Sequence, residues 1–152
     1  MIAVTGTIDT IEAVHDYVRC MEEAAAIRYD QMAGAAQLMH DKDSAATLHS
    51  LAAAARRRAR TYSGSGSKAD HALPPAPPLA ADGLEIGSWQ VMEIALDMEY
   101  SMLTMIEVLL ALAESPESQA EAQKLADRKR LHLIELESRQ NRSPKPPGFQ
   151  GD

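Results

Sequence analysis

Apolar residues recur at steps of three and four positions through the first quarter of the chain. This spacing places their side chains on one face of an α-helix. The stripe comprises Ile11, Val14, Val18, Met21, Ala25, Tyr29, Met32 and Ala36. Asp9 and Glu12 have the spacing of a capping box, so we expect the helix to begin at residue 9.

A polar turn at residues 40–43 separates this helix from a second apolar stripe. The second stripe comprises Leu48, Leu51, Ala52, Ala55 and Ala59. Asp43 or Ser44 can cap the second helix, because both side chains accept hydrogen bonds from backbone amides. The connection is too short for anything but an antiparallel helical hairpin.

The second half of the chain repeats this pattern. We expect Ser88 to cap a helix whose stripe comprises Val91, Ala95, Met98, Met102, Met105, Leu109 and Leu112. Ser115 and Pro116 then indicate a helix stop and restart, with Ser115 as cap and Pro116 at the first helical position. The fourth stripe comprises Ala122, Leu125, Lys129, His132, Leu133 and Leu136.

The segment 63–87 lacks such a stripe and is rich in glycine, serine and proline. We interpret it as a long crossover that lets the second hairpin dock on the first; the alternative is a PxxP ligand for another protein. Residues 141–152 carry three prolines and two glycines and are expected to form a mobile tail. The chain is thus predicted to be all-α, a single antiparallel four-helix bundle over residues 9–140.

Composition narrows the classes of protein. Aromatic residues make up 4% of the chain, which suits a core of Ala, Leu, Met, Ile and Val between helices. The net charge of −7 argues against wholesale nucleic-acid binding. Cys20 is the single cysteine, which excludes an internal disulfide and fits a reducing compartment. Residues 1–10 do not resemble a signal peptide and no apolar run is long enough for a membrane span, so we expect a soluble cytoplasmic protein.

Three polar residues interrupt the apolar stripes. Glu22 lies between Val18 and Ala25, and Glu99 lies between Ala95 and Met102, so both carboxylates face the core. His132 holds the same kind of position in the fourth helix. Buried carboxylates are costly unless they are paired or bound to a metal. Carboxylates on facing helices of a bundle are also the way in which pairs of redox-active metals are held.

Four segments resemble the helix motifs of rubrerythrins and other ferritin-like di-iron proteins. Residues 21–29 are similar to the first-helix motif, in which a ligand glutamate precedes an Arg-Tyr pair. Residues 51–58 and 125–132 resemble the LAxxExxH motifs of the second and fourth helices, and residues 95–99 resemble the AxxxE of the third. The similarity covers residues 9–140 without the proline-rich segment. It implies a ferritin-like bundle in which Glu22, Glu99 and His132 correspond to metal ligands.

The chain departs from this family pattern at three positions. Ala55 and Lys129 stand where the resemblance calls for bridging glutamates, and Arg58 stands where it calls for a histidine. The loss of both bridging carboxylates and the gain of two cations argue against a dinuclear centre, so we expect no cofactor.

We predict an inner salt-bridge cluster in place of the metal, with His132 at its edge. The cluster comprises Glu22, Arg58, Glu99 and Lys129. In the alternative arrangement, Arg58 and Lys129 extend to solvent and leave two protonated glutamates.

Other polar and methionine clusters are interpreted structurally. One basic run could contact phosphate; it comprises Arg56, Arg57, Arg58, Arg60 and Lys68. Because successive residues point in all directions around a helix, we interpret this run as a solvated face. The methionines of the third helix indicate a plastic core or a dimer face. No nucleophilic triad order, phosphate-binding glycine loop or CxxC motif is present.

The sequence therefore predicts a ferritin-like bundle that has lost its dinuclear site and serves as a non-catalytic binding or structural protein. We expect a homodimer through an Ala/Met-rich helix face, an unidentified protein partner being the alternative. A second hypothesis is an iron- or manganese-binding oxidoreductase, or an iron-handling protein, with one Fe, Mn or Zn on Glu22, Glu99 and His132. A third is a binder of a small hydrophobic ligand in space left beside Ala55 and Ala25.

Overall fold

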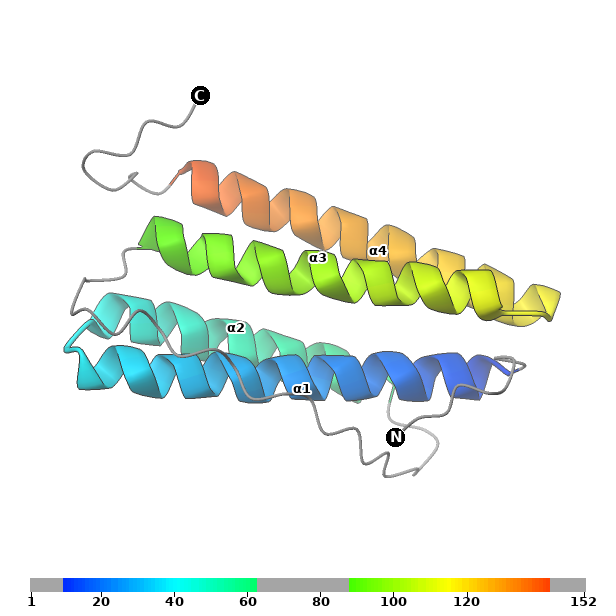
Figure 1. The fold of residues 1–152 in the computed structure, drawn as a ribbon, viewed down its shortest axis with the longest axis horizontal. Coiled ribbons are helices and arrows are strands. Elements are labelled where there is room, and N and C mark those ends of the chain that lie inside the picture. Colours follow the sequence, from blue (N-terminus) through cyan, green and yellow to red (C-terminus); the bar gives the residue numbers. More distant parts are fainter. Residues whose placement is uncertain (1–9, 63–87, 143–152) are drawn as a thin grey trace.

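The computed structural model describes residues 10–62 and 88–142, which form four α-helices and no β-strand. These helices are α1 (Ile11–Leu38), α2 (Lys42–Arg60), α3 (Ser88–Leu112) and α4 (Pro116–Asn141), shown in Figure 1. The predicted all-α class is confirmed. The predicted crossover at 63–87 and residues 143–152 of the predicted tail lie outside the described residues.

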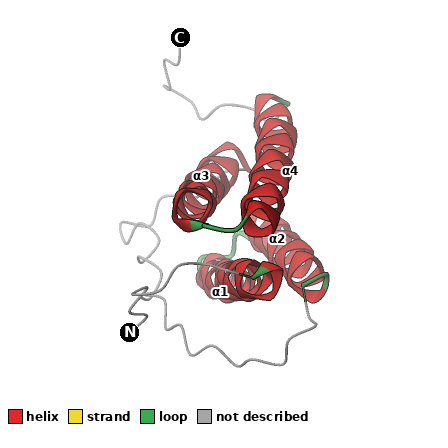
Figure 2. Cartoon of the chain, turned by 90° about the vertical axis from the view of Figure 1, so that its right-hand side faces the viewer, coloured by secondary structure: helices red, strands yellow, loops and turns green. Residues whose placement is uncertain are grey.

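The helices associate as two hairpins around a shared centre. The closest packing is between α1 and α2 and between α3 and α4, and Figure 2 shows these two pairs facing one another. In Figure 1, α1 and α4 run in one direction and α2 and α3 run in the other. Each hairpin is therefore antiparallel, as its short turn requires.

The predicted start of α1 is wrong, because the cap lies one residue later than expected. Thr10, in extended conformation, caps the helix, and its side-chain oxygen accepts a hydrogen bond from the backbone amide of Ala13 at 3.1 Å. Asp9, the predicted capping residue, lies outside the described residues, and the helix begins at Ile11. Both Thr and Asp are good capping residues, so their adjacency left the start ambiguous.

The predicted cap of α2 is also wrong. Asp41, and not Asp43 or Ser44, caps this helix, and its carboxylate accepts from the backbone amide of Ser44 at 3.1 Å. His40 adopts a left-handed conformation with φ of 60°, which turns the chain sharply enough for α2 to begin at Lys42. At α4 the prediction is confirmed, since Ser115 is the cap and Pro116 follows it.

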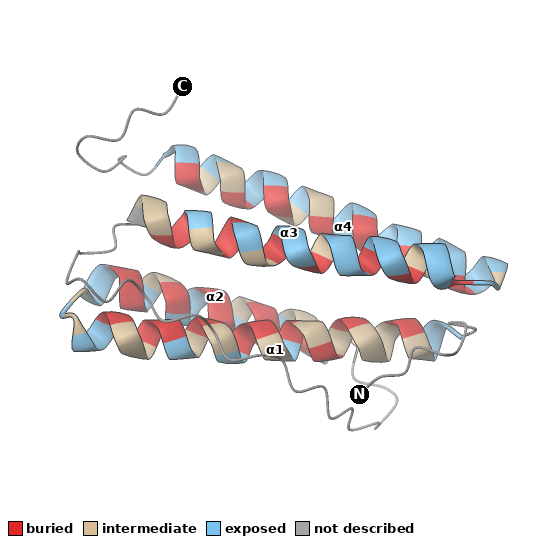
Figure 3. Cartoon of the chain, in the orientation of Figure 1, coloured by how far each residue is buried: buried red, intermediate tan, exposed pale blue. Residues whose placement is uncertain are grey.

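The stripes of α1, α2 and α4 are largely buried, whereas the stripe of α3 departs from the prediction near its end (Figure 3). Met105 and Leu112 are each 39% exposed, while Ile106 is 1% exposed. The buried face continues from Met102 through Ile106 and Leu109. The predicted stripe took a step of three after Met102, and the helix takes a step of four, which the mean period of 3.6 residues equally permits.

The buried apolar side chains form two clusters along the bundle. One cluster surrounds Tyr29 and Leu48, and the other surrounds Val18 and Leu125.

Within residues 10–62 and 88–142, no helix combines the length and hydropathy needed to cross a membrane.

Candidate functional site

Four charged side chains, one from each helix, meet between the two apolar clusters. They are Glu22 of α1, Arg58 of α2, Glu99 of α3 and Lys129 of α4, and we call them the internal ion-pair cluster. Each glutamate and Lys129 falls between apolar residues of its helix stripe, so helix geometry directs all three side chains inward. Glu22 is 1%, Glu99 0% and Lys129 4% exposed, so all three are buried.

The ammonium group of Lys129 lies between the two carboxylates. Its Nζ donates to Oε2 of Glu22 at 2.9 Å and to Oε1 of Glu99 at 2.7 Å. These are short, charge-assisted hydrogen bonds, the strongest kind that side chains form in proteins. Lys129 therefore links α1, α3 and α4 through one atom.

The guanidinium of Arg58 approaches the same carboxylates from α2. Its Nε donates to Oε2 of Glu22 at 2.9 Å, and its Nη2 lies 3.6 Å from Oε2 of Glu99. About a quarter of the Arg58 side chain, 27%, remains exposed. The alternative in which Arg58 and Lys129 both extend to solvent is not the arrangement observed.

Tyr29 and His132 complete the surroundings of Glu99. The buried Tyr29 hydroxyl donates to Oε2 of Glu99 at 2.8 Å. Tyr29 was assigned to the apolar stripe and to the Arg-Tyr pair of the first-helix motif, and its bond to Glu99 was not predicted. Its position two turns after Glu22 on the same face was the signal that it reaches the site. His132 lies at the edge, with Nδ1 3.3 Å from Oε1 of Glu99 but not in hydrogen-bonding geometry.

The charges within the cluster balance, because two carboxylates face one ammonium and one guanidinium. Burial by itself raises the pKa of Glu99, but the nearby His132 ring and the charges of Lys129 and Arg58 outweigh it and hold that pKa well below its usual range. Burial, followed by the charge of Glu99, raises the pKa of the Tyr29 phenol. Glu99 is thus held as a carboxylate and Tyr29 as a hydrogen-bond donor.

The donor atoms of this site do not fit a dinuclear metal centre. Lys129 Nζ occupies the position between the two carboxylates at which a cation would bind, and the buried Ala55 supplies no ligand atom. In the part of the chain that the structure describes, no three His, Cys, Asp or Glu side chains converge on one point where a metal ion could bind. Of the six positions that the resemblance assigns to ligands, four therefore carry ion pairs, His132 lies at their edge, and Ala55 is an apolar core residue.

One cavity adjoins the cluster. It has a volume of about 180 Å³, and Glu22, Arg58, Lys129 and His132 contribute to its wall together with the apolar Val18, Ile106 and Leu125. One carboxylate oxygen of Glu22, Oε1, is buried without a hydrogen-bond partner among the described residues. Neither Ala55 nor Ala25, beside which the sequence analysis expected space for a ligand, lines this cavity.

Comparison of the chain with protein-family models, with curated proteins and with solved structures gave no significant match.

Replacing Lys129 is predicted to unbalance the cluster. Lys129→Met leaves two buried carboxylates with one cation, and we expect the free energy of unfolding to fall by about 3–5 kcal/mol at neutral pH. Adding Glu22→Gln removes one of the two carboxylates, so the double variant should be more stable than the single one. Urea denaturation measures both effects without screening the charges.

Lys124→Met is the matched control, since Lys124 lies on the same helix with its side chain 55% exposed. Its unfolding free energy should change by less than about 0.5 kcal/mol. If Lys129→Met were as stable as this control, the assigned role of Lys129 would be contradicted. The same would follow if adding Glu22→Gln to Lys129→Met lowered the unfolding free energy further.

The lowered pKa of Glu99 predicts an acid-dependent loss of stability. A carboxyl group with a pKa lower in the folded than in the unfolded state stabilises the fold above the unfolded value of 4.5, and this contribution is lost as the pH falls toward the folded value. We expect the unfolding free energy to drop between about pH 5 and pH 2, and Glu99→Gln to flatten that slope. The exposed Glu114 provides the control, because Glu114→Gln should retain the slope of the native chain. An unchanged slope in Glu99→Gln would show that other groups cause the acid sensitivity.

Proposed function

We propose that this chain is a ferritin-like four-helix bundle in which the internal ion-pair cluster takes the place of a dinuclear metal centre. We further propose that it acts as a non-catalytic binding or structural protein. The observation that carries the proposal is Lys129 Nζ, which binds Glu22 and Glu99 at once. An ammonium at this point neutralises the same two carboxylates that a metal ion would.

The arrangement of the helices supports the ferritin-like part of the proposal. Five residues that align with family ligand positions converge from four helices on one level of the bundle. They are Glu22, Arg58, Glu99, Lys129 and His132. Ala55, the sixth position, lies buried one turn before Arg58. Such convergence is what a helix order and register like those of the family would produce, and it supports the proposal in this way.

The chemistry of the cluster supports the non-catalytic part. Lys129 uses its ammonium as a donor to two carboxylates, so its nitrogen is not available as a nucleophile. Glu22 and Glu99 are almost fully buried, and a substrate would have to displace an ion pair to reach either of them. The arrangement serves to hold four helices in one register.

An uncharged stripe on the outside of α3 supports the proposed homodimer. Its members are exposed and lack a formal charge; they are Ser101, Thr104, Met105, Val108, Ala111 and Leu112. Val108, at the middle of the stripe, is 46% exposed. Two copies of the chain would remove this stripe from water by packing α3 on α3.

Metal content tests the proposal directly. We expect less than about 0.1 metal ion per chain after purification without chelator and anaerobic reconstitution with Fe(II) or Mn(II). The triple variant Ala55→Glu, Arg58→His, Lys129→Glu restores the ligand set that the resemblance implies and should bind about two divalent ions per chain. Its four carboxylates would then balance two divalent ions, so metal should also raise its melting temperature.

Adding Glu99→Gln to the triple variant is the control and should lower its metal content. The proposal would be overturned if the native protein retained about one metal ion or more per chain and the double variant Glu22→Ala, Glu99→Ala lost it. That result would favour the iron- or manganese-dependent oxidoreductase. A folded triple variant without metal would contradict the ferritin-like geometry.

Light scattering after gel filtration tests the dimer. We expect twice the chain mass of 16.5 kDa for the native protein and the monomer mass for Val108→Glu, because a carboxylate buried in the interface would be unpaired. Ile27, 55% exposed on α1, gives the control, and Ile27→Glu should remain dimeric. A native monomer, or equal effects of both variants, would count against the α3 interface.

A further inference from the structure

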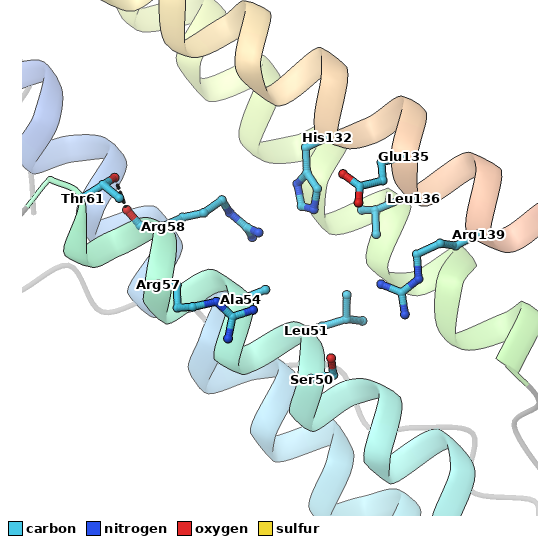
Figure 4. Close-up of a pocket in the computed structure, with 10 residues that line it drawn as sticks. All are labelled: Ser50, Leu51, Ala54, Arg57, Arg58, Thr61, His132, Glu135, Leu136 and Arg139. Carbon is cyan, nitrogen blue, oxygen red and sulfur yellow. Dashed lines mark hydrogen bonds between the residues drawn. The ribbon is translucent and has the colours of Figure 1, made fainter.

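A groove separate from the core of the ion-pair cluster runs between α2 and α4. The pairs α1–α2 and α3–α4 pack closely, and the pairs α2–α3, α1–α4 and α1–α3 pack loosely. In the described residues, α2 and α4 make no close backbone contact. Ser50 and Ala54, both short side chains, line the α2 side and leave the space between the helices unfilled. The result is a cavity of about 450 Å³, shown in Figure 4.

The walls of this groove are cationic in a chain that is acidic overall. Three arginines line it, Arg57 and Arg58 from α2 and Arg139 from α4, but Arg58 is paired with Glu22 and Glu99 of the internal ion-pair cluster. The groove therefore sets Arg57 and Arg139 against the single carboxylate of Glu135. The chain as a whole carries a net charge of −7, so this concentration of positive charge is local. Guanidinium groups bind carboxylates and phosphates through paired hydrogen bonds, which makes the groove a place for an oxyanion.

The remainder of the lining is mixed, with the polar Ser50, Thr61 and His132 beside three apolar residues. Leu51 and Ala54 from α2 and Leu136 from α4 contribute to the groove between the arginines. Leu51 is 4% and Leu136 1% exposed, so the accessible apolar side chain of this lining is Ala54, which a short hydrocarbon body would cover. The volume of about 450 Å³ is in the range that small organic ligands occupy in proteins.

Arg58 connects the groove to the internal ion-pair cluster. It lines the groove and the inner cavity of about 180 Å³, and its Nε donates to Glu22. His132 also lines both spaces. A ligand held in the groove therefore touches the two side chains that separate solvent from the buried carboxylates.

From these observations we propose that the groove between α2 and α4 binds a small amphiphilic anion, a carboxylate or phosphate monoester on a short apolar chain. Arg57 and Arg139 bind the anionic group, and the apolar lining at Ala54 contacts the hydrocarbon. This site does not depend on the proposed loss of the metal centre, since Arg57 and Arg139, which bind the anionic group, are not members of the internal ion-pair cluster.

Amide chemical shifts of the full chain, measured by NMR during titration, test the proposal with defined probes. Octanoate and octyl phosphate should shift the amides of α2 and α4 around Arg57 and Arg139, and their relative affinity distinguishes a carboxylate from a phosphate ligand. Octanol and octyltrimethylammonium carry the same hydrocarbon without the negative charge and should not saturate these shifts.

Charge-removing variants complete the test. Arg57→Gln or Arg139→Gln should each weaken binding of the anionic probe about three- to fivefold, and the double variant about tenfold or more. Arg60→Gln is the matched control, because Arg60 belongs to the same basic run but does not line the groove. Equal binding of octanol, equal loss in Arg60→Gln, or no saturable shifts with either anion would overturn the proposal.

Discussion

The burial of two carboxylates within a small apolar core is the constraint around which this bundle is organised. Glu22 and Glu99 are removed from water almost completely, which would cost several kcal/mol for each if it were unpaired. Lys129 and Arg58 offset that cost because each brings a cation from a different helix to the same oxygens. The pairing requires all four helices, so none of them can dissociate without leaving a buried charge uncompensated.

The ionic layer also explains how the core is divided. Apolar side chains around Tyr29 pack on one side of it and those around Val18 pack on the other. Apolar side chains of similar volume replace one another in a core at small cost, so apolar packing by itself specifies a helix register only weakly. The ion pairs do not tolerate a change of register, because a shift of one turn moves every donor away from its acceptor. Apolar burial thus supplies stability, while the ionic layer specifies one register.

Local patterns predicted most of the fold, and the failures have a physical origin. Apolar spacing located four helices, and charged residues within the stripes of α1, α3 and α4 predicted which side chains would meet, because helix geometry alone determines the face of each residue. The end of the α3 stripe was wrong at Met105, since steps of three and four both fit the sequence there. The bond between Tyr29 and Glu99 was missed because the two residues are 70 positions apart in the sequence. The helix face of Tyr29 indicated that it reaches the site, but not which carboxylate it binds.

The balance of charge in the buried layer restricts which single substitutions such a sequence can accept during evolution. A substitution at any one of Glu22, Arg58, Glu99 or Lys129 leaves an odd charge in the interior, so each single replacement passes through a destabilised intermediate. During evolution these four residues can therefore be replaced by metal ligands or by neutral residues in two ways. Either two of them change together, or the protein is stable enough to remain folded after a single destabilising substitution. Among relatives of this chain, these four positions are expected to covary across helices far apart in sequence.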